Sequence, residues 1–81
     1  MININELKEP PQEDYSDLTF GDRLRAIRKA RGLTLSELSS KSGILLNRLG
    51  EYERGQVAPT ITRLEWLCKA LNVSASDLLG F

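Results

Sequence analysis

From residue 20 onward, apolar residues recur every three or four positions, which is the spacing of one face of an α-helix. The first stripe, Phe20, Leu24 and Ile27, predicts a helix that begins after Thr19 and ends at Gly32. Later stripes have the same period and are bounded by capping residues or glycines. Five helices are predicted: between Thr19 and Gly32, at about 35–42, at about 45–53, between Thr60 and Asn72, and from Ala75 to Leu79.

The middle of the chain has the helix-start and helix-stop residues of a helix-turn-helix. Thr34 and Glu37 have the spacing of a capping box at a helix start. Gly43 stands where a helix can end in the left-handed conformation, and the next helix follows within two residues. The second helix of such a motif can enter a DNA major groove. A plain αα-hairpin within a bundle has the same spacing, so the pattern alone leaves both interpretations open.

The later helices supply the rest of a hydrophobic core. Ser74 and Asp77 form a further capping pair for a short last helix. With short links and no internal repeat, the pattern predicts one compact all-α domain of five helices. The residues expected to face inward on the third and fourth helices are Ile44, Leu49, Tyr52, Ile61, Leu64, Leu67, Cys68 and Leu71.

Residues 1–18 differ from the rest of the chain. They contain Pro10 and Pro11 and scattered apolar residues without a period, which predicts an extended N-terminal arm followed by a helical domain over 19–81. The arm carries one lysine and five acidic residues, whereas 19–81 carries ten basic and six acidic residues. A mildly basic domain suits a polyanionic partner, although a solvated mixed surface has the same composition.

Composition argues against several classes of function. The chain has 81 residues, no histidine and a single cysteine, Cys68, so a zinc site or a Ser-His or Cys-His catalytic set cannot be assembled. We therefore expect no enzyme activity, metal or cofactor. A chain of this length leaves no room for a separate small-molecule domain. No apolar run reaches the length of a membrane span, and a lone thiol fits a reducing cytoplasm.

Taken together, the motifs resemble one known family. The chain from Phe20 to Leu79 resembles the Xre-type (phage repressor and Cro-like) helix-turn-helix family, a compact repressor-like DNA-binding fold. The resemblance implies a sequence-specific transcriptional regulator, repressor-like in action, that binds double-stranded DNA through its third helix. It rests on the order and spacing of Leu24–Arg28, Arg31–Thr34, Glu37–Leu38, Ser42–Ile44, Glu53–Gly55, Pro59–Ile61 and Lys69–Val73.

The resemblance also assigns roles on the third helix. It implies a structural ion pair between Arg28 and Glu53. Asn47 can read adenine, Arg48 guanine or a phosphate, and Glu51 cytosine N4. These three residues form the expected base-reading set, together with the two leucines that precede them.

Leu45 and Leu46 depart from the family pattern, because relatives often begin this helix with Ser or Thr followed by Gln. Neither leucine can cap the helix or hydrogen-bond a base. The core stripe is already filled, so two uses remain open. One is apolar contact with thymine methyl groups, with Leu46 the first choice, and the other is a protein-binding patch.

Phosphate contacts are expected around the same helix. Leu35 stands where relatives often carry a phosphate-binding Gln, and Gly50 lets the backbone approach closely at a cost of about 1 kcal/mol in helix propensity. Either packing or closeness to DNA is expected to explain that glycine. The phosphate-binding candidates are Arg31, Thr34, Leu35, Gly50, Arg54, Gln56 and Thr60.

Several apolar residues near the C-terminus have no assigned core position. In the family the last helix commonly forms a two-fold contact, which implies a homodimer built on Trp66, Leu78, Leu79 and Phe81. The acidic arm is expected to dock away from the third helix. The alternative function is a protein-interaction module on the same fold, antitoxin-like or an anti-repressor partner, that uses the exposed leucines and Trp66.

Overall fold

The computed structural model describes residues 19–81, and in this range it contains five α-helices and no strand. They are α2 (Phe20–Ala30), α3 (Leu35–Ser42), α4 (Leu46–Glu53), α5 (Ile61–Leu71) and α6 (Ala75–Leu79). The predicted five-helix, all-α fold is confirmed. The predicted N-terminal arm and its docking face lie outside the described residues.

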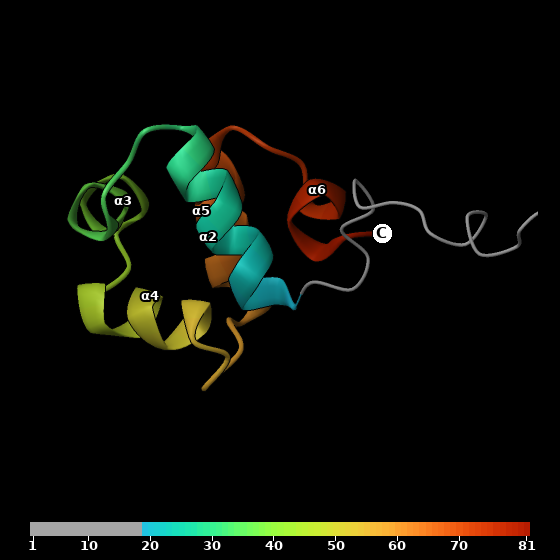
Figure 1. Cartoon of the computed structure of the whole chain (residues 1–81), viewed down its shortest axis with the longest axis horizontal. Coiled ribbons are helices and arrows are strands. Elements are labelled where there is room, and N and C mark those ends of the chain that lie inside the picture. The colour runs from blue at the N-terminus through green and yellow to red at the C-terminus, as the bar shows by residue number, and fades with distance from the viewer. Residues whose placement is uncertain (1–18) are drawn as a thin grey trace, which may run out of the picture.

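Two central helices separate the motif from the C-terminal end. α2 and α5 lie in the middle of the view, α3 and α4 on one side, and α6 with the C-terminus on the other (Figure 1). α2 contacts both α4 and α6, while α3 contacts α4 and α5. α2 therefore connects the helix-turn-helix to the end of the chain.

Four of the five helices begin at the capping residue that the sequence predicts. The side chains of Thr19, Thr34, Thr60 and Ser74 each accept a hydrogen bond from a backbone N–H in the first turn. Asn72 closes α5 in the left-handed conformation, with φ of 58°. These ends are local, which is why the sequence alone locates them.

The core lies where α2 to α6 converge. The predicted inward residues of α4 and its approach, Ile44, Leu49 and Tyr52, are buried. Ile61, however, is 75% exposed, so its placement on the inward face of α5 is wrong. It is the first residue of α5, and full burial on this helix is reached further along. The fully buried core residues are Leu24, Leu38, Leu49, Tyr52, Leu67, Leu71 and Leu78.

Leu78 overturns one expectation about the dimer surface. Its side chain is fully buried within the single chain, as part of the core cluster. It therefore cannot form a contact between two copies. The five-residue α6 is held to the domain by Leu78 and by Gly80, against which the guanidinium of Arg23 lies directly. A place in the terminal helix does not make a residue available to a second copy, because this helix packs on its own chain.

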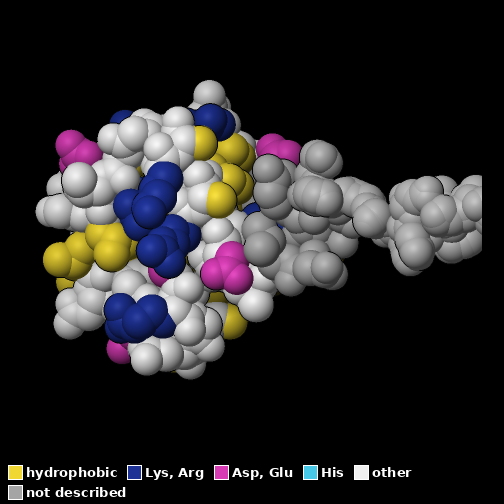
Figure 2. All heavy atoms as spheres, viewed as in Figure 1, with side chains coloured by type: hydrophobic (Ala, Val, Ile, Leu, Met, Phe, Trp, Pro, Cys, Tyr) yellow, Lys and Arg dark blue, Asp and Glu magenta, His cyan; other side chains and the backbone are white. Residues whose placement is uncertain are grey.

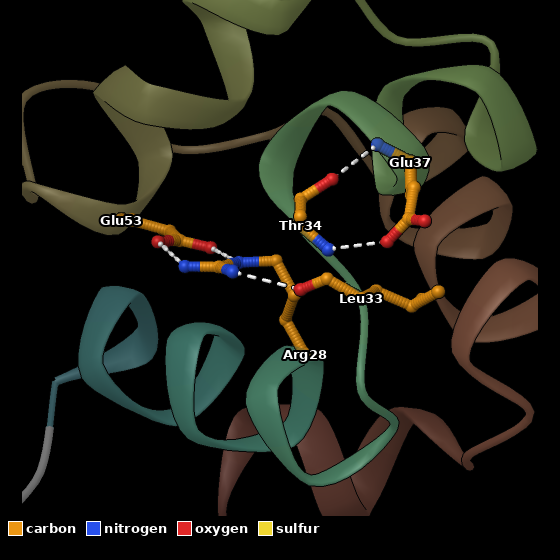
Figure 3. A network of polar contacts seen from close by, with 5 residues as sticks. All are labelled: Arg28, Leu33, Thr34, Glu37 and Glu53. Carbon is orange, nitrogen blue, oxygen red and sulfur yellow. Dashed lines mark hydrogen bonds and ion pairs between the residues drawn. The ribbon is translucent and has the colours of Figure 1, made fainter.

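The predicted ion pair between Arg28 and Glu53 is confirmed, and it joins three segments (Figure 3). Arg28 Nε donates to Glu53 Oε2 at 2.6 Å, and Nη2 donates to Oε1 at 3.0 Å. Nη1 donates to the carbonyl of Leu33 at 2.9 Å. The hydrogen bond to Glu53 raises the pKa of Arg28, against the opposing effect of burial. One guanidinium thus ties α2, the segment before α3, and α4 together.

A second close approach joins α2 to the end of α4. A Cβ on Gly21 would stand 2.5 Å from the carbonyl oxygens of both Tyr52 and Glu53. Real Cβ atoms do not come so near to backbone oxygens, so glycine is what permits this crossing. Nothing in the sequence pattern marks this position, because the partner lies more than 30 residues away.

Removal of the buried carboxylate should destabilise the domain strongly. The side chains of Arg28 and Glu53 are only 10% and 7% exposed. Glu53→Ala would leave a buried guanidinium without its counter-charge, and we expect the free energy of unfolding to fall by about 3–5 kcal/mol. Urea unfolding followed by circular dichroism measures this change. The matched control is Glu51→Ala on the same helix, which removes a surface pair and should change stability by about 0–1 kcal/mol. Equal effects of the two substitutions would contradict the scaffold role.

Candidate nucleic-acid interface

The turn between α3 and α4 is fixed by its own hydrogen bonds. Gly43 closes α3 with φ of 79°, in the left-handed region. The Ser39 hydroxyl donates to the carbonyl of Ile44 at 2.6 Å, and the Ile44 N–H donates to Ser42 Oγ at 3.2 Å. Ile44 itself is buried, so the turn is anchored in the core. α4 consequently leaves the turn in a fixed direction.

α4 has one buried and one exposed face. Leu49 and Tyr52 are buried against the core. The expected base-reading residues occupy the other face: four consecutive side chains are exposed, and Glu51 is half-exposed one turn further on. The structure therefore brings the predicted base-reading residues together on one surface at the N-terminal end of α4. They are Leu45, Leu46, Asn47, Arg48 and Glu51.

Two of these residues are paired with each other. Arg48 Nη1 donates to Glu51 Oε1 at 3.0 Å, and the two side chains are 47% and 35% exposed. A solvent-exposed i,i+3 pair of this kind contributes about 0–1 kcal/mol, so either partner can exchange it for a base edge. The pairing also neutralises a carboxylate that would otherwise repel phosphates. Sequence reasoning treated the two as independent, whereas the structure couples them.

The first turn of α4 differs from those of the other helices. Leu45 occupies the N-cap position and makes no side-chain hydrogen bond to the helix. Leu45 is 75% exposed and Leu46 is 46% exposed. In Figure 2, hydrophobic side chains reach the surface at the left edge, over the turn between α3 and α4, beside a row of basic side chains. The expectation that these leucines lie outside the core is confirmed.

All of the phosphate-binding candidates except Leu35 and Gly50 are exposed. Thr34 and Thr60 are exposed at the starts of α3 and α5, where their oxygens accept from Glu37 N and Arg63 N. Each hydroxyl keeps its proton to donate. Arg54 and Gln56 are exposed in the segment after α4 and share a hydrogen bond of 3.3 Å.

Arg31, Leu35 and Gly50 make contacts with other parts of the domain. Leu35 is half-buried and packs against the core. Arg31 Nε donates to the carbonyl of Leu71 at 2.7 Å, and Nη2 to that of Asn72 at 3.3 Å. A cation is favourable at this negative end of α5. Gly50 is buried, and a Cβ there would stand 2.9 Å from Nη1 of Arg54, the flexible end of a side chain that can move aside.

A second group of apolar side chains is exposed elsewhere on the chain. Trp66 on α5 is 41% exposed, as expected, and Phe81 at the C-terminus is 87% exposed. Leu79, close to Phe81 in the sequence, is half-buried. These residues belong to α5, α6 and the chain end, not to α4. The structure thus separates the candidate dimer residues from the candidate DNA-reading residues.

Comparison with known proteins identifies this arrangement. The sequence model of the helix-turn-helix family (HTH_3) matches residues 24–78. The chain belongs to this family. It is 35% identical over 63 residues to the immunity repressor protein of Bacillus phage phi105, which covers 78% of this chain and 44% of that protein. The chain therefore spans less than half the length of that relative.

Solved structures of the family have the same fold. The restriction-modification controller protein C.AhdI from Aeromonas hydrophila has a TM-score of 0.72 and 35% identity, over 74% of this chain and 91% of that one. SinR, a master regulator for biofilm formation solved in complex with DNA, has a TM-score of 0.71 and 36% identity, over 74% and 97% of the two chains. The Xre-type resemblance deduced from the motifs is confirmed.

The described residues show little sign of other chemistry. Burial raises the pKa of the Cys68 thiol, and the nearby charges of Asp77 and Glu65 raise it further, so the thiol stays protonated. Within residues 19–81, no group of three or more His, Cys, Asp or Glu is placed to hold a metal ion. None of the described helices is long and apolar enough to span a membrane.

The two glycines of the α2–α4 region should respond oppositely to alanine. Gly50→Ala meets only the movable end of Arg54, at 2.9 Å, and we expect it to stabilise the domain by about 0.5–1 kcal/mol through helix propensity. Gly21→Ala meets backbone oxygens, and we expect a loss of about 1–3 kcal/mol. Thermal melts of both variants measure the difference. If Gly50→Ala raises the melting temperature but weakens DNA binding, the backbone at Gly50 lies against DNA and packing is not its main role.

Proposed function

We propose that this chain is a sequence-specific DNA-binding transcriptional regulator, repressor-like in action, that places α4 in the major groove of an operator. The observation that carries the proposal is the geometry of α4. Its buried face is fixed by the core and by Glu53, while the side chains at its N-terminal end are exposed together. In helix-turn-helix proteins this end of the second helix contacts base edges.

The exposed side chains match the hydrogen-bonding pattern of the major groove. Asn47 can bond adenine N6 and N7 together, and Arg48 can bond guanine O6 and N7 together. Glu51, now paired with Arg48, either holds that guanidinium in place or accepts from cytosine N4. Membership of the helix-turn-helix family and the DNA complex of a related protein support this assignment.

Four of the candidate residues are proposed to bind DNA phosphates. Thr34 and Thr60 stand at helix starts, where backbone N–H groups and the helix dipole also favour an anion. Arg54 and Gln56 extend the set beyond the end of α4. Leu35 and Gly50 are left out because Leu35 packs against the core and Gly50 is buried. Arg31 is left out because two of its guanidinium nitrogens are bonded to the carbonyls of Leu71 and Asn72.

The proposal includes a homodimer on a two-fold operator. A domain of this size makes few DNA contacts, and pairing doubles them. Trp66, Leu79 and Phe81 form the proposed contact between copies, without Leu78. The two α4 helices would then lie about 34 Å apart, one turn of DNA. As a DNA-binding regulator the chain acts in the cytoplasm. It has no catalytic role in this function.

A protein-interaction module is the second candidate, favoured by the exposure of Leu45, Leu46 and Trp66. The two functions differ in their response to salt. DNA binding releases counterions and weakens steeply as salt rises, whereas an apolar protein contact does not.

Asn47→Ala should reduce specificity rather than general affinity. We expect a loss of about 1–3 kcal/mol on the operator, with relaxed preference at one base pair and little change on random DNA. Fluorescence anisotropy with both DNAs measures it. Arg54→Ala is the contrasting variant: it should weaken both DNAs and lower the salt slope by about one. Equal losses on both DNAs for Asn47→Ala would remove Asn47 from base reading.

The proposed dimer surface can be tested without DNA. Light scattering on the full chain at tens of micromolar should give the mass of two copies, and Trp66→Ala combined with Phe81→Asp should give one, because both sites lose apolar contact area. Leu45→Ala, at the exposed apolar N-cap of α4, is the control and should leave the dimer intact. A wild-type chain that scatters as a monomer rules out this interface.

A further inference from the structure

The apolar start of α4 is the feature that hydrogen-bond readout leaves unexplained. The turn before it is closed by Ser39 and Ser42, and Ile44 fills the core position at its end. Leu45 and Leu46 therefore cannot fold inward without opening the turn. They project from the N-terminal end of the helix that is proposed to enter the groove.

Leucine at this position also forgoes a stabilising interaction. Thr or Ser caps every other helix of the described chain, and Leu45 leaves the first turn of α4 without a side-chain acceptor. Ser, Thr, Asp and Asn stabilise a helix at this position, whereas leucine does not. A surface leucine that is worse for the helix than serine requires another reason to be there.

The surroundings of the two leucines fit DNA better than a protein partner. Apart from Gly43, the exposed residues nearest to them in the sequence are Lys41, Asn47 and Arg48, which are polar or cationic. The other large exposed apolar residues belong to other segments: Val57 after α4, Ile61 and Trp66 on α5, and Phe81 at the C-terminus. An apolar pair flanked by cations suits a polyanion that offers apolar groups between its phosphates.

DNA offers one such group in the major groove, the C5-methyl of thymine. We propose that Leu45 and Leu46 form a binding surface for the 5-methyl groups of pyrimidines, so that the operator carries thymine where α4 begins. This inference rests on the proposed function. Because 5-methylcytosine places its methyl group at the same ring position, methylation of a cytosine there would replace thymine in the contact. Methylation of a cytosine at the position that faces the two leucines would thus strengthen binding.

The experiment first selects operator DNA from a random pool with the full chain, then replaces each thymine by deoxyuridine in turn. Deoxyuridine pairs like thymine and lacks only the methyl group. At one or two positions per half-site we expect about a fourfold loss of affinity, equal to ~0.8 kcal/mol for one buried methyl group. At the same position, 5-methylcytosine should bind about fourfold more tightly than cytosine.

Two variants assign the effect to the leucines. Leu45→Ser should raise the melting temperature, because it supplies the missing cap, and together with Leu46→Ala it should abolish the difference between thymine and deoxyuridine. Asn47→Ala is the control, because it weakens operator binding but keeps the methyl effect. A melting temperature of the double variant no lower than that of the wild type excludes unfolding as the cause.

The outcomes separate this inference from the proposed function. Selection of a specific operator that shows no loss at any deoxyuridine, or a methyl effect that survives in the leucine variants, overturns the methyl-binding surface alone. Failure to select any preferred sequence overturns the DNA-reading function and this inference with it. A deoxyuridine effect that disappears only in the leucine variants supports both.

Discussion

The guanidinium of Arg28 is the point at which the domain is held together. It bonds Glu53 at the end of α4 and the carbonyl of Leu33 before α3, so the two helices of the motif are positioned from a third. Arginine suits this position because its planar guanidinium donates two hydrogen bonds to the carboxylate and a third to the carbonyl. Lysine has a single ammonium group and could not bond the same three oxygens with this planar geometry.

Steric contact reinforces the ion pair at the same end of α4. Gly21 lets α2 approach the carbonyls of Tyr52 and Glu53, and this closeness brings the carboxylate within reach of Arg28. Position and charge are thus coupled, since a wider crossing would separate the ions in a poorly solvated site. The buried residues of α4 begin at Leu49, and the side chains of the first turn are left free to meet a partner.

The sequence was sufficient wherever the decisive partner was near in the chain. Caps such as Thr34 with Glu37, and the left-handed ends at Gly43 and Asn72, follow from residues within four positions. Family resemblance added the Arg28–Glu53 pair, which local pattern could not supply.

Contacts between residues far apart in the chain could not be predicted from local pattern. Arg31 bonds carbonyls about 40 residues away, and Gly21 meets a helix end more than 30 residues away. Leu78 was assigned to a dimer surface because its helix is terminal, yet tertiary packing buries it. Periodicity describes a helix face but does not say how far along the helix its neighbours reach, which is why Ile61 was misplaced.

The motif's second helix is the element least able to stand alone. It has eight residues, no side-chain N-cap and an internal glycine, each of which weakens an isolated helix. Its order therefore comes from Leu49 and Tyr52 in the core and from the ion pair at its end. The turn bonds of Ser39 and Ser42 and buried Ile44 hold its start, and the Arg28–Glu53 pair holds its end. Loss of the Arg28 contact would therefore release one of the two ends of α4, although Arg28 is not itself among the base-reading residues.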